Sequence, residues 1–339
     1  MRLGLFLVSP QWPGRSHGEA LAETVRLAQL ADGLGLDDVW LAEHHFVSYG
    51  VCPSAVTLAG HLLGTTTRVD VGTAVSVLPV THPVALAEQA AMLDQLAPGR
   101  FTLGIGRGGP WRELVVQGGG VERFACGFAE ELDALLGAWR APTVAGPGPT
   151  VPFPRVAVVP RPATPGGPPV RVAATSEATV DVAADRGLPL LLGMHADDAE
   201  RAAMVRRWTT RAGCAGDHVA VGIAHVADTR ADAVREVREA LPTWLGPGLA
   251  GHVRADGAPR TLRDPVAYTD LLCRLHPVGS VDDVAERLAE TAAATGVERL
   301  ALMVQTTGDP ARTTATVEAL AHVRGLLSCH SEDHAPGRR

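Results

Sequence analysis

Residues 38–46 read Asp-Val-Trp-Leu-Ala-Glu-His-His-Phe, so a short apolar run ends directly in three polar side chains. A run this short and apolar is typical of a strand that is buried on both faces, as the strands of a parallel sheet are. In a (β/α)8 barrel the active site is built at the C-terminal ends of such strands. The stretch therefore predicts a parallel β/α protein whose chemistry lies where its strands end.

The same alternation continues in both directions along the chain. Strand-like apolar runs occupy residues 3–8, 38–42, 69–77, 101–105, 170–173, 188–192, 219–226 and 300–304. Helical spacing of apolar residues is found at 19–34, 53–63, 83–96, 123–139, 178–186, 197–212, 231–245, 281–295 and 310–327. Eight strands, each followed by a helix, predict a single (β/α)8 TIM barrel over residues 1–327. A doubly wound open sheet is the structural alternative.

Two stretches rich in proline and glycine interrupt this rhythm. Residues 141–169 and 246–260 are expected to be long insertion loops, and the residues after the second loop follow no clear pattern. Residues 328–339 are expected to be a disordered tail. We expect the two loops to shape the substrate pocket.

Composition restricts the classes of function. Hydrophobic residues make up 46% of the 339 residues, enough for a large core, and the longest apolar runs are far shorter than the roughly 20 residues of a membrane helix. The net charge of -7, without any basic run, argues against a nucleic-acid partner. The five cysteines are dispersed without metal or redox spacing, which indicates reduced thiols in a cytoplasmic protein.

The chain contains no lysine, since all 30 of its Lys and Arg residues are arginine. Aldolases that form a Schiff base and pyridoxal-phosphate enzymes need a lysine amine, which arginine cannot replace because its guanidinium stays protonated. The carbamylated lysine of many metallohydrolase barrels is absent too, and the first predicted strand lacks a His-x-His pair. The sequence therefore predicts no metal centre.

Polar side chains follow three of the predicted strands. Glu43, His44 and His45 follow the second, where a neutral imidazole can act as a general base; the alternative is that one histidine binds a carbonyl and the other faces solvent. Thr175 and Ser176 follow the fifth strand and open a helix. Hydroxyls and free N–H groups at a helix start can bind an anion, although plain helix capping explains them as well.

Residues 104–109 read Gly-Ile-Gly-Arg-Gly-Gly and match the G-x-G-x-x-G pattern of dinucleotide-binding folds. That pattern should open a helix at once, but Pro110 and Trp111 follow, so we reject this interpretation. The glycines still let a ligand approach the backbone, and Arg107 offers a fork of donors for phosphate. The alternative is a tight turn with a surface arginine. Together with Ser176 of the neighbouring strand, Arg107 favours a phosphate site.

In combination, these segments resemble the bacterial luciferase-like monooxygenase family, and its luciferase α subunit in particular. The resemblance runs in order along the chain from residue 1 to about residue 325 and is weakest in the two loops. It is carried by residues 42–46, 71–74, 78–79, 82–84, 93–95, 99–101, 104–108 and 183–189.

The resemblance implies a barrel that binds reduced FMN (FMNH2) as a diffusible substrate, supplied by a separate flavin reductase. Oxygen then adds at flavin C4a, and the hydroperoxide oxygenates a small organic substrate. Most relatives are homodimers, and the apolar helix predicted at 83–96 offers a surface for a two-fold contact. Relatives of this kind act on intermediates of natural-product pathways, including antibiotic biosynthesis.

The resemblance also implies roles for particular residues. His44 corresponds to the catalytic base, and Glu43 to a residue beside the flavin ring. Ala74 and Val75 correspond to a non-prolyl cis peptide beneath that ring. The phosphate-binding positions correspond to Arg107, Ser176 and Thr179, and Arg123 is a further candidate for them.

Two positions of the flavin site depart from luciferase. Gly106 stands where luciferase has a reactive cysteine, and Thr175 where it has a glutamate. These departures weigh against light emission and against long-chain aldehydes as substrates. Two other functions stay open on the same resemblance. One is hydride transfer with the deazaflavin F420, and the other is flavin binding without catalysis, as in proteins that lack part of the barrel.

Overall fold

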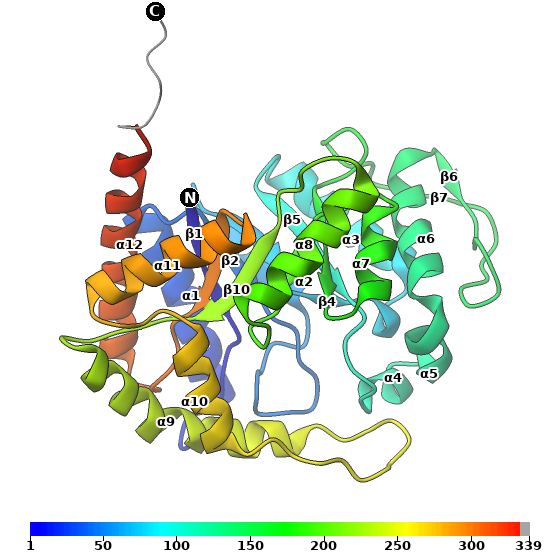
Figure 1. Ribbon diagram of the computed structural model, residues 1–339. Helices are drawn as coiled ribbons and strands as arrows, with labels where there is room; N and C mark the ends of the chain where they lie inside the picture. The colour runs from blue at the N-terminus through cyan, green and yellow to red at the C-terminus, as the bar shows by residue number, and fades with distance from the viewer. Residues whose placement is uncertain (333–339) are drawn as a thin grey trace, which may run out of the picture.

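Eight parallel strands pair in a closed ring within the computed structural model, which describes residues 1–332 (Figure 1). Around the ring the order is β3–β2–β1–β13–β10–β9–β8–β5, and pairing of β3 with β5 closes it. The strands are β1 (Arg2–Leu7), β2 (Asp38–Leu41), β3 (Asp70–Thr73), β5 (Phe101–Gly106), β8 (Val170–Ala174), β9 (Leu190–Leu192), β10 (Val219–Ile223) and β13 (Arg299–Met303). The predicted TIM barrel is confirmed, and the open sheet is excluded.

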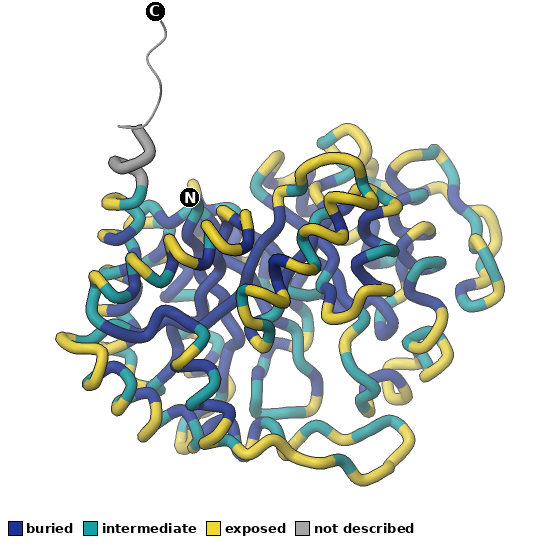
Figure 2. The backbone as a smooth tube through the Cα atoms, viewed as in Figure 1, coloured by how far each residue is buried: buried dark blue, intermediate teal, exposed yellow. Residues whose placement is uncertain are grey.

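Helices surround the ring, with buried inner faces and exposed outer faces (Figure 2). They are α1 (His17–Leu34), α2 (Ala55–Thr65), α3 (Pro83–Leu96), α6 (Phe128–Arg140), α7 (Glu177–Ala184), α8 (Asp198–Ala212), α9 (Arg230–Gly251), α10 (Pro265–Leu275), α11 (Val281–Thr295) and α12 (Pro310–Glu332). Local sequence signals set several of their ends. For example, α1 begins at a capping box of Ser16 and Glu19 and ends at Gly35, whose φ is 79°.

Two predicted strands are each divided in the structure. The run at 69–77 forms β3 and then β4 (Ser76–Val77), separated by the cis peptide between Ala74 and Val75. The run at 219–226 forms β10 and then β11 (His225–Val226), which pairs with β12 (Val278–Gly279) in a small separate sheet. Both predictions were right about extended structure but missed the breaks, which no apolar pattern marks.

The segment between β5 and α6 is less regular than predicted. It contains the short helices α4 (Glu113–Val116) and α5 (Gly120–Glu122) and a π-helical turn, η2 (Arg123–Gly127). A 3-10 turn, η1 (Leu78–Val80), precedes α3. The helix predicted from residue 123 therefore becomes regular only at Phe128.

The first insertion loop, 141–169, is confirmed as irregular apart from the antiparallel pair β6 (Thr143–Val144) and β7 (Val156–Ala157). The second prediction was partly wrong, because α9 continues to Gly251 through Pro242 and Pro247. Burial of Trp244 and Leu245 in the core outweighs the helix-breaking tendency of the two prolines.

The end of the chain also differs from the prediction. Helix α10 and strand β12 were not predicted at all. Helix α12 continues to Glu332, inside the segment 328–339 expected as a disordered tail, and the rest of that segment lies outside the described residues.

The end of the barrel where the strands begin is filled by paired charges. Arg299 Nη1 lies 3.2 Å from Asp38 Oδ2, and the Asp38 side chain is 1% exposed. Arg171 pairs with Asp217. The carboxylate fits because β1 has a glycine opposite it: a Cβ on Gly4 would lie 1.9 Å from Asp38 Oδ1. We call this end, where these ion pairs lie, the closed end of the barrel.

The part of the chain that the structure describes has three further properties. No helix there is long and apolar enough to cross a membrane. No cluster of His, Cys, Asp and Glu there could hold a metal ion. Cys52, Cys126, Cys214 and Cys273 are free thiols.

Candidate active site

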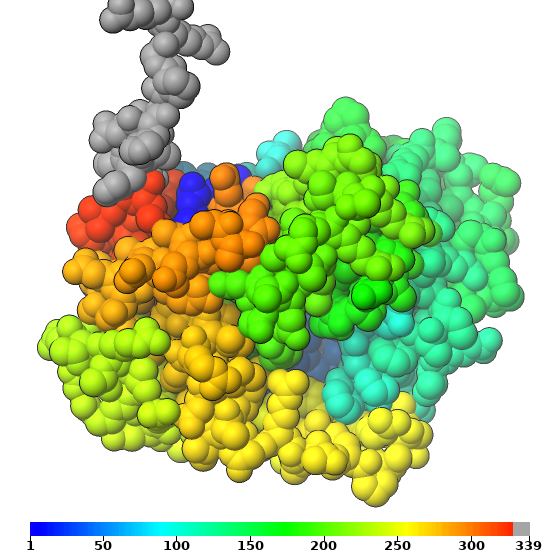
Figure 3. Space-filling view, viewed as in Figure 1, coloured from blue at the N-terminus to red at the C-terminus, as the bar shows by residue number. Residues whose placement is uncertain are grey.

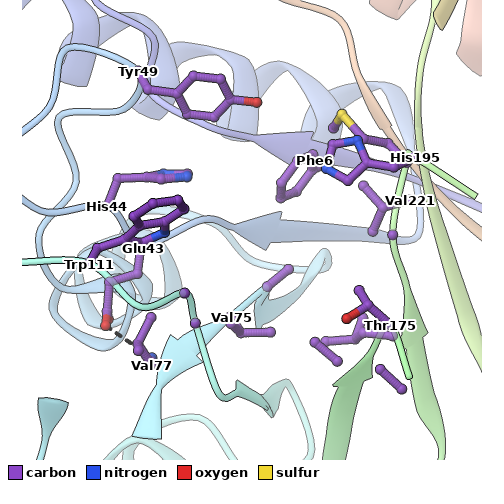
Figure 4. A pocket seen from close by; sticks show the side chains of 18 of the residues that line it. Phe6, Glu43, His44, Tyr49, Val75, Val77, Trp111, Thr175, His195 and Val221 are labelled. Atoms are coloured by element: carbon purple, nitrogen blue, oxygen red, sulfur yellow. Dashed lines mark hydrogen bonds between the residues drawn. The ribbon is translucent and has the colours of Figure 1, made fainter. Parts of the chain in front are cut away.

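A cavity of about 440 Å³ lies at the opposite end of the barrel, where the strands finish (Figure 4). Its volume is within the range of about 300–1,000 Å³ that is usual for small-molecule sites. One wall is made of small and aliphatic side chains from the strand ends. These are Ala74, Val75, Ala173, Ala174, Leu191, Leu192 and Val221. Polar and aromatic side chains from other strands and from the loops form the remaining walls.

Glu43 connects two elements of the site. Its Oε1 accepts a hydrogen bond of 3.0 Å from the N–H of Val77, drawn as a dashed line in Figure 4. Its Oε2 accepts one of 3.1 Å from the N–H of Ala55, in the first turn of α2. The carboxylate therefore fixes β4 just after the cis peptide, and it also neutralises free donors at a helix start.

His44 is packed tightly on one side of its ring. Its backbone N–H donates to the carbonyl of Cys52 at 2.9 Å, and its ring meets Tyr49 edge to face with centroids 4.9 Å apart. Its Nδ1 is buried, and no group among the described residues bonds to it. Nε2 is thus the nitrogen left to reach the cavity. Burial, followed by the nearby rings of His252 and His45, lowers the pKa of His44 to about 3, so the ring is neutral near pH 7.

Gly50 makes this position of His44 possible. A Cβ at residue 50 would lie 2.8 Å from His44 Nδ1 and 2.5 Å from the carbonyl oxygen of Val8. Any side chain there would push the imidazole or the end of β1 away. His45 points elsewhere: its Nδ1 lies 2.8 Å from Gln117 Nε2, and its Nε2 lies 3.4 Å from Glu43 Oε1. The two histidines therefore differ in role, because only His44 has an unbonded ring nitrogen toward the cavity.

The wall opposite His44 is flat because of Gly106. A Cβ on Gly106 would lie 2.7 Å from Val75 Cγ2 and 3.3 Å from the Cβ of Ala173. Val75 therefore fills the space that a side chain at position 106 would need. Gly106 itself does not line the cavity but supports the two residues that do.

Arg107 and the start of α7 lie on neighbouring strands, because β5 pairs with β8. The buried Nε of Arg107 has no hydrogen-bond partner among the described residues, and its guanidinium carbon lies 5.5 Å from the centroid of the Phe128 ring. Ser176 is the exposed N-cap of α7, and its Oγ lies 3.1 Å from Thr179 Oγ1. Thr175 lines the cavity, whereas Arg107, Ser176 and Thr179 lie beyond its lining.

The structure contradicts a phosphate-binding role for Arg123. Its guanidinium pairs with Glu131, whose side chain is fully buried, and donates to the carbonyl of Thr81 at 2.9 Å. An arginine that neutralises a buried carboxylate cannot turn to a ligand without leaving that charge unpaired.

Sequence reasoning missed several residues around the cavity, among them Tyr49, Trp111, His195 and His252. His195 stands three residues after β9, a strand-end position like that of His44, so the same rule would have found it. Burial lowers the pKa of His195 to about 4, and its Nδ1 lies 2.5 Å from the hydroxyl oxygen of Tyr268. His252 was hidden in the predicted loop and is placed by the extension of α9.

Comparison with known proteins agrees with this geometry. The sequence profile of the luciferase-like monooxygenase family matches residues 1–299. An alkanal monooxygenase α chain of the Kryptophanaron alfredi symbiont is 35% identical over 201 residues, which cover 59% of this chain and 56% of that protein. This match thus spans little more than half of the relative. The α chain from Photobacterium leiognathi is 26% identical over 331 residues, 91% of this chain and 93% of that protein.

Solved structures share the fold over almost the whole chain. A monooxygenase from Streptomyces bottropensis superposes with a TM-score of 0.84 at 24% identity, over 97% of this chain and 100% of that one. The oxygenating constituent of 3,6-diketocamphane monooxygenase from Pseudomonas putida, in complex with FMN, has a TM-score of 0.75 at 21% identity, over 95% and 96%. An F420-dependent secondary alcohol dehydrogenase in complex with an F420-acetone adduct superposes with a TM-score of 0.75 at 16% identity, over 95% of this chain and 98% of that one.

At these identities the structural likeness establishes the fold alone. The family assignment comes from the sequence profile, which covers most of the chain and includes every strand end that lines the cavity. The chain belongs to the luciferase-like monooxygenase family.

Proposed function

We propose that the chain is a two-component monooxygenase that uses FMNH2 and O2 to oxygenate a small organic substrate, in secondary metabolism such as antibiotic biosynthesis. One observation carries the proposal. A neutral histidine with an unbonded ring nitrogen stands across a cavity from a flat wall of small side chains, with an unpaired arginine beyond one edge. The monooxygenases of the family supply the analogy for the reaction.

The residues present fit FMN. The wall of Ala74, Val75 and Ala173 offers a flat apolar surface to an aromatic ring, and Gly106 keeps that surface free of a further side chain. The unpaired Nε of Arg107 and the exposed start of α7 offer donors suited to a phosphate. No carboxylate among the described residues is paired with Arg107, so its charge is available to an anion.

Reduced FMN, when bound, supplies the two electrons with which O2 is cleaved so that one oxygen atom enters the substrate. The chain's own residues control the surroundings of that reaction. His44 accepts a proton at Nε2, which requires the neutral tautomer with hydrogen on Nδ1. The aliphatic wall would exclude water from a bound flavin, and Glu43 holds β4 in place beside that wall.

The proposal includes two protein partners. A separate flavin reductase supplies FMNH2, as the family analogy suggests. A second copy of the chain is proposed to cover α3, because Met92 and Leu96 on that helix are 49% and 74% exposed. Sedimentation should therefore give a dimer, and Leu96→Asp should give a monomer. An unchanged sedimentation coefficient for Leu96→Asp would place the contact elsewhere.

Titration under anaerobic conditions tests the cofactor. FMNH2 is expected to bind more tightly than reduced F420, and O2 uptake is expected with FMNH2 alone. The F420-dependent enzyme of the same fold makes F420 the second candidate. Tight binding of reduced F420 without turnover of FMNH2 would replace our proposal with hydride transfer. Tight FMN binding without any O2-dependent reaction would leave a flavin-binding protein, an outcome that the complete barrel argues against.

A further inference from the structure

A second cavity adjoins the first. It has a volume of about 400 Å³ and shares five lining residues with the cavity described above, including His44 and His195. The segment that joins α9 to α10 covers it, and Figure 3 shows the hollow between this yellow segment and the green and cyan segments. Because His44 lines both cavities, a molecule in this outer chamber would contact it.

The outer chamber is positively charged. Arg260 and Arg263 line it, and none of the described residues that line it is acidic. Neither arginine forms an ion pair with a described carboxylate, whereas Arg254 of the same segment pairs with Asp256 at 2.6 Å. Asp264, next to Arg263, accepts a hydrogen bond from the N–H of Ala267 at 2.7 Å and so caps α10.

Aromatic rings form the other walls of the chamber. Trp111 and Tyr49 flank His252, with ring centroids 5.3 Å and 5.8 Å from it, and Tyr49 is stacked on Trp244 at 4.6 Å. The guanidinium of Arg260 lies 5.1 Å from the centroid of Trp111, and that of Arg263 lies 4.9 Å from Tyr268. Arg260 also donates to the carbonyl of Leu249, and Arg263 Nη1 lies 3.4 Å from His195 Nδ1, but neither has a carboxylate partner among the described residues. Rigid rings beside such guanidinium groups suit a planar anion, because the rings bind its face and the guanidinium fork binds its charge.

We propose that the outer chamber is the organic-substrate site and that the substrate is a planar aromatic compound carrying a carboxylate. The carboxylate binds Arg263 and Arg260, and the ring lies among Trp111, Tyr49 and His252, with its far edge toward His44. This assignment rests on the proposed function for the claim that the bound compound is oxygenated. The binding itself does not depend on the flavin.

The test uses the full chain and two probes that differ in charge but little in size, 2-naphthoate and 2-naphthamide. Calorimetric titration is expected to show that the wild type binds the naphthoate at least about tenfold more tightly than the naphthamide, as a hydrogen-bonded charge pair implies. Arg263→Gln should reduce this preference, and Arg260→Gln combined with it should abolish it. Arg263→Lys should keep part of it, because the charge remains while the fork is lost.

Arg206→Gln is the matched control, because Arg206 is an exposed arginine of α8 outside both cavities. It should leave the preference unchanged. Equal binding of the two probes by the wild type, no binding of either, or a preference that survives the double variant would each overturn the assignment. If the double variant does not fold, Arg263→Gln decides, since the Arg263 side chain is exposed.

Titration of FMN in the same samples separates the two proposals. Naphthoate preference without FMN binding would retain the chamber and refute the flavin function. FMN binding without a preference for naphthoate would refute the chamber assignment and leave the flavin function standing.

Discussion

The two ends of the barrel contain similar side chains in opposite states. Where the strands begin, each buried arginine meets a carboxylate: Arg299 pairs with Asp38, and Arg171 with Asp217. Where the strands end, Arg107 has no carboxylate partner among the described residues, and His44 leaves its Nε2 unbonded toward the cavity. Charges that are satisfied within the protein stabilise or specify the fold, whereas unsatisfied ones remain available to a ligand. The comparison assigns stability to the closed end and function to the open end.

The largest effect is expected from His44→Ala. O2 uptake driven by bound FMNH2 should fall by about 10²–10⁴-fold, the usual contribution of a general acid or base, once the background of free flavin is subtracted. FMN affinity and the melting temperature should change little, because Nδ1 forms no bond that holds the fold. His61→Ala, at an exposed position of α2, is the control. Unchanged turnover would remove His44 from the mechanism.

A loss of stability is expected at the closed end. Arg299→Gln leaves the buried carboxylate of Asp38 without its main partner, which should lower the free energy of unfolding by about 3–5 kcal/mol. FMN affinity should stay the same. Urea denaturation measures the effect, with Arg235→Gln as control, since that exposed pair with Asp232 should contribute little to stability. Equal losses from both variants would contradict the proposed role of the closed end.

A smaller effect on affinity is expected from Arg107→Gln. FMN should bind about 10–100-fold more weakly, since a hydrogen bond to a charged group contributes about 1.5–3 kcal/mol. Riboflavin, which lacks the phosphate, should bind as it does to the wild type. Fluorescence titration of both flavins provides the comparison, and Arg140→Gln on α6 is the control. If the variant weakened both flavins equally, Arg107 would act on the ring or on the fold instead of the phosphate.

The smallest effect, taken over one pH unit, is a dependence of the free energy of unfolding on pH. Burial lowers the pKa of His218 to about 4, so the native state binds fewer protons than the unfolded state between about pH 4 and 6.5. Stability should therefore fall as the pH falls through this window, by about 1.4 kcal/mol per pH unit for this histidine. Urea midpoints at a series of pH values, compared with those of His218→Gln, measure its share. An identical slope in the variant would mean that His218 does not titrate there.

Local signals predicted the barrel well. Helices α3 and α11 have the predicted bounds, because proline, capping residues and apolar spacing all lie within a few neighbouring residues. Local signals also predicted the strand ends that carry Glu43, His44 and Thr175, and these three residues line the cavity. The prediction failed where distant contacts decide the structure. The extension of α9 and the position of His252 depend on packing against Tyr49 and the core, which no pattern near residue 250 records.

The corner of the site proposed for the phosphate could be predicted only in part. Adjacent strands place Arg107 and Ser176 at the same corner, as the sequence indicated, but the role of Gly106 became clear only from its contact with Val75. Arg123 was misjudged because its buried partner, Glu131, is eight residues away across a π-helical turn. Spacing rules for regular helices do not describe such a turn.

The most direct measurement is a crystal structure of the chain with FMN. The account predicts that the flavin ring lies between His44 and the wall of Ala74 and Val75, and that the phosphate contacts Arg107 and Ser176. A flavin bound in the outer chamber, or a ring whose phosphate points away from Arg107, would contradict it.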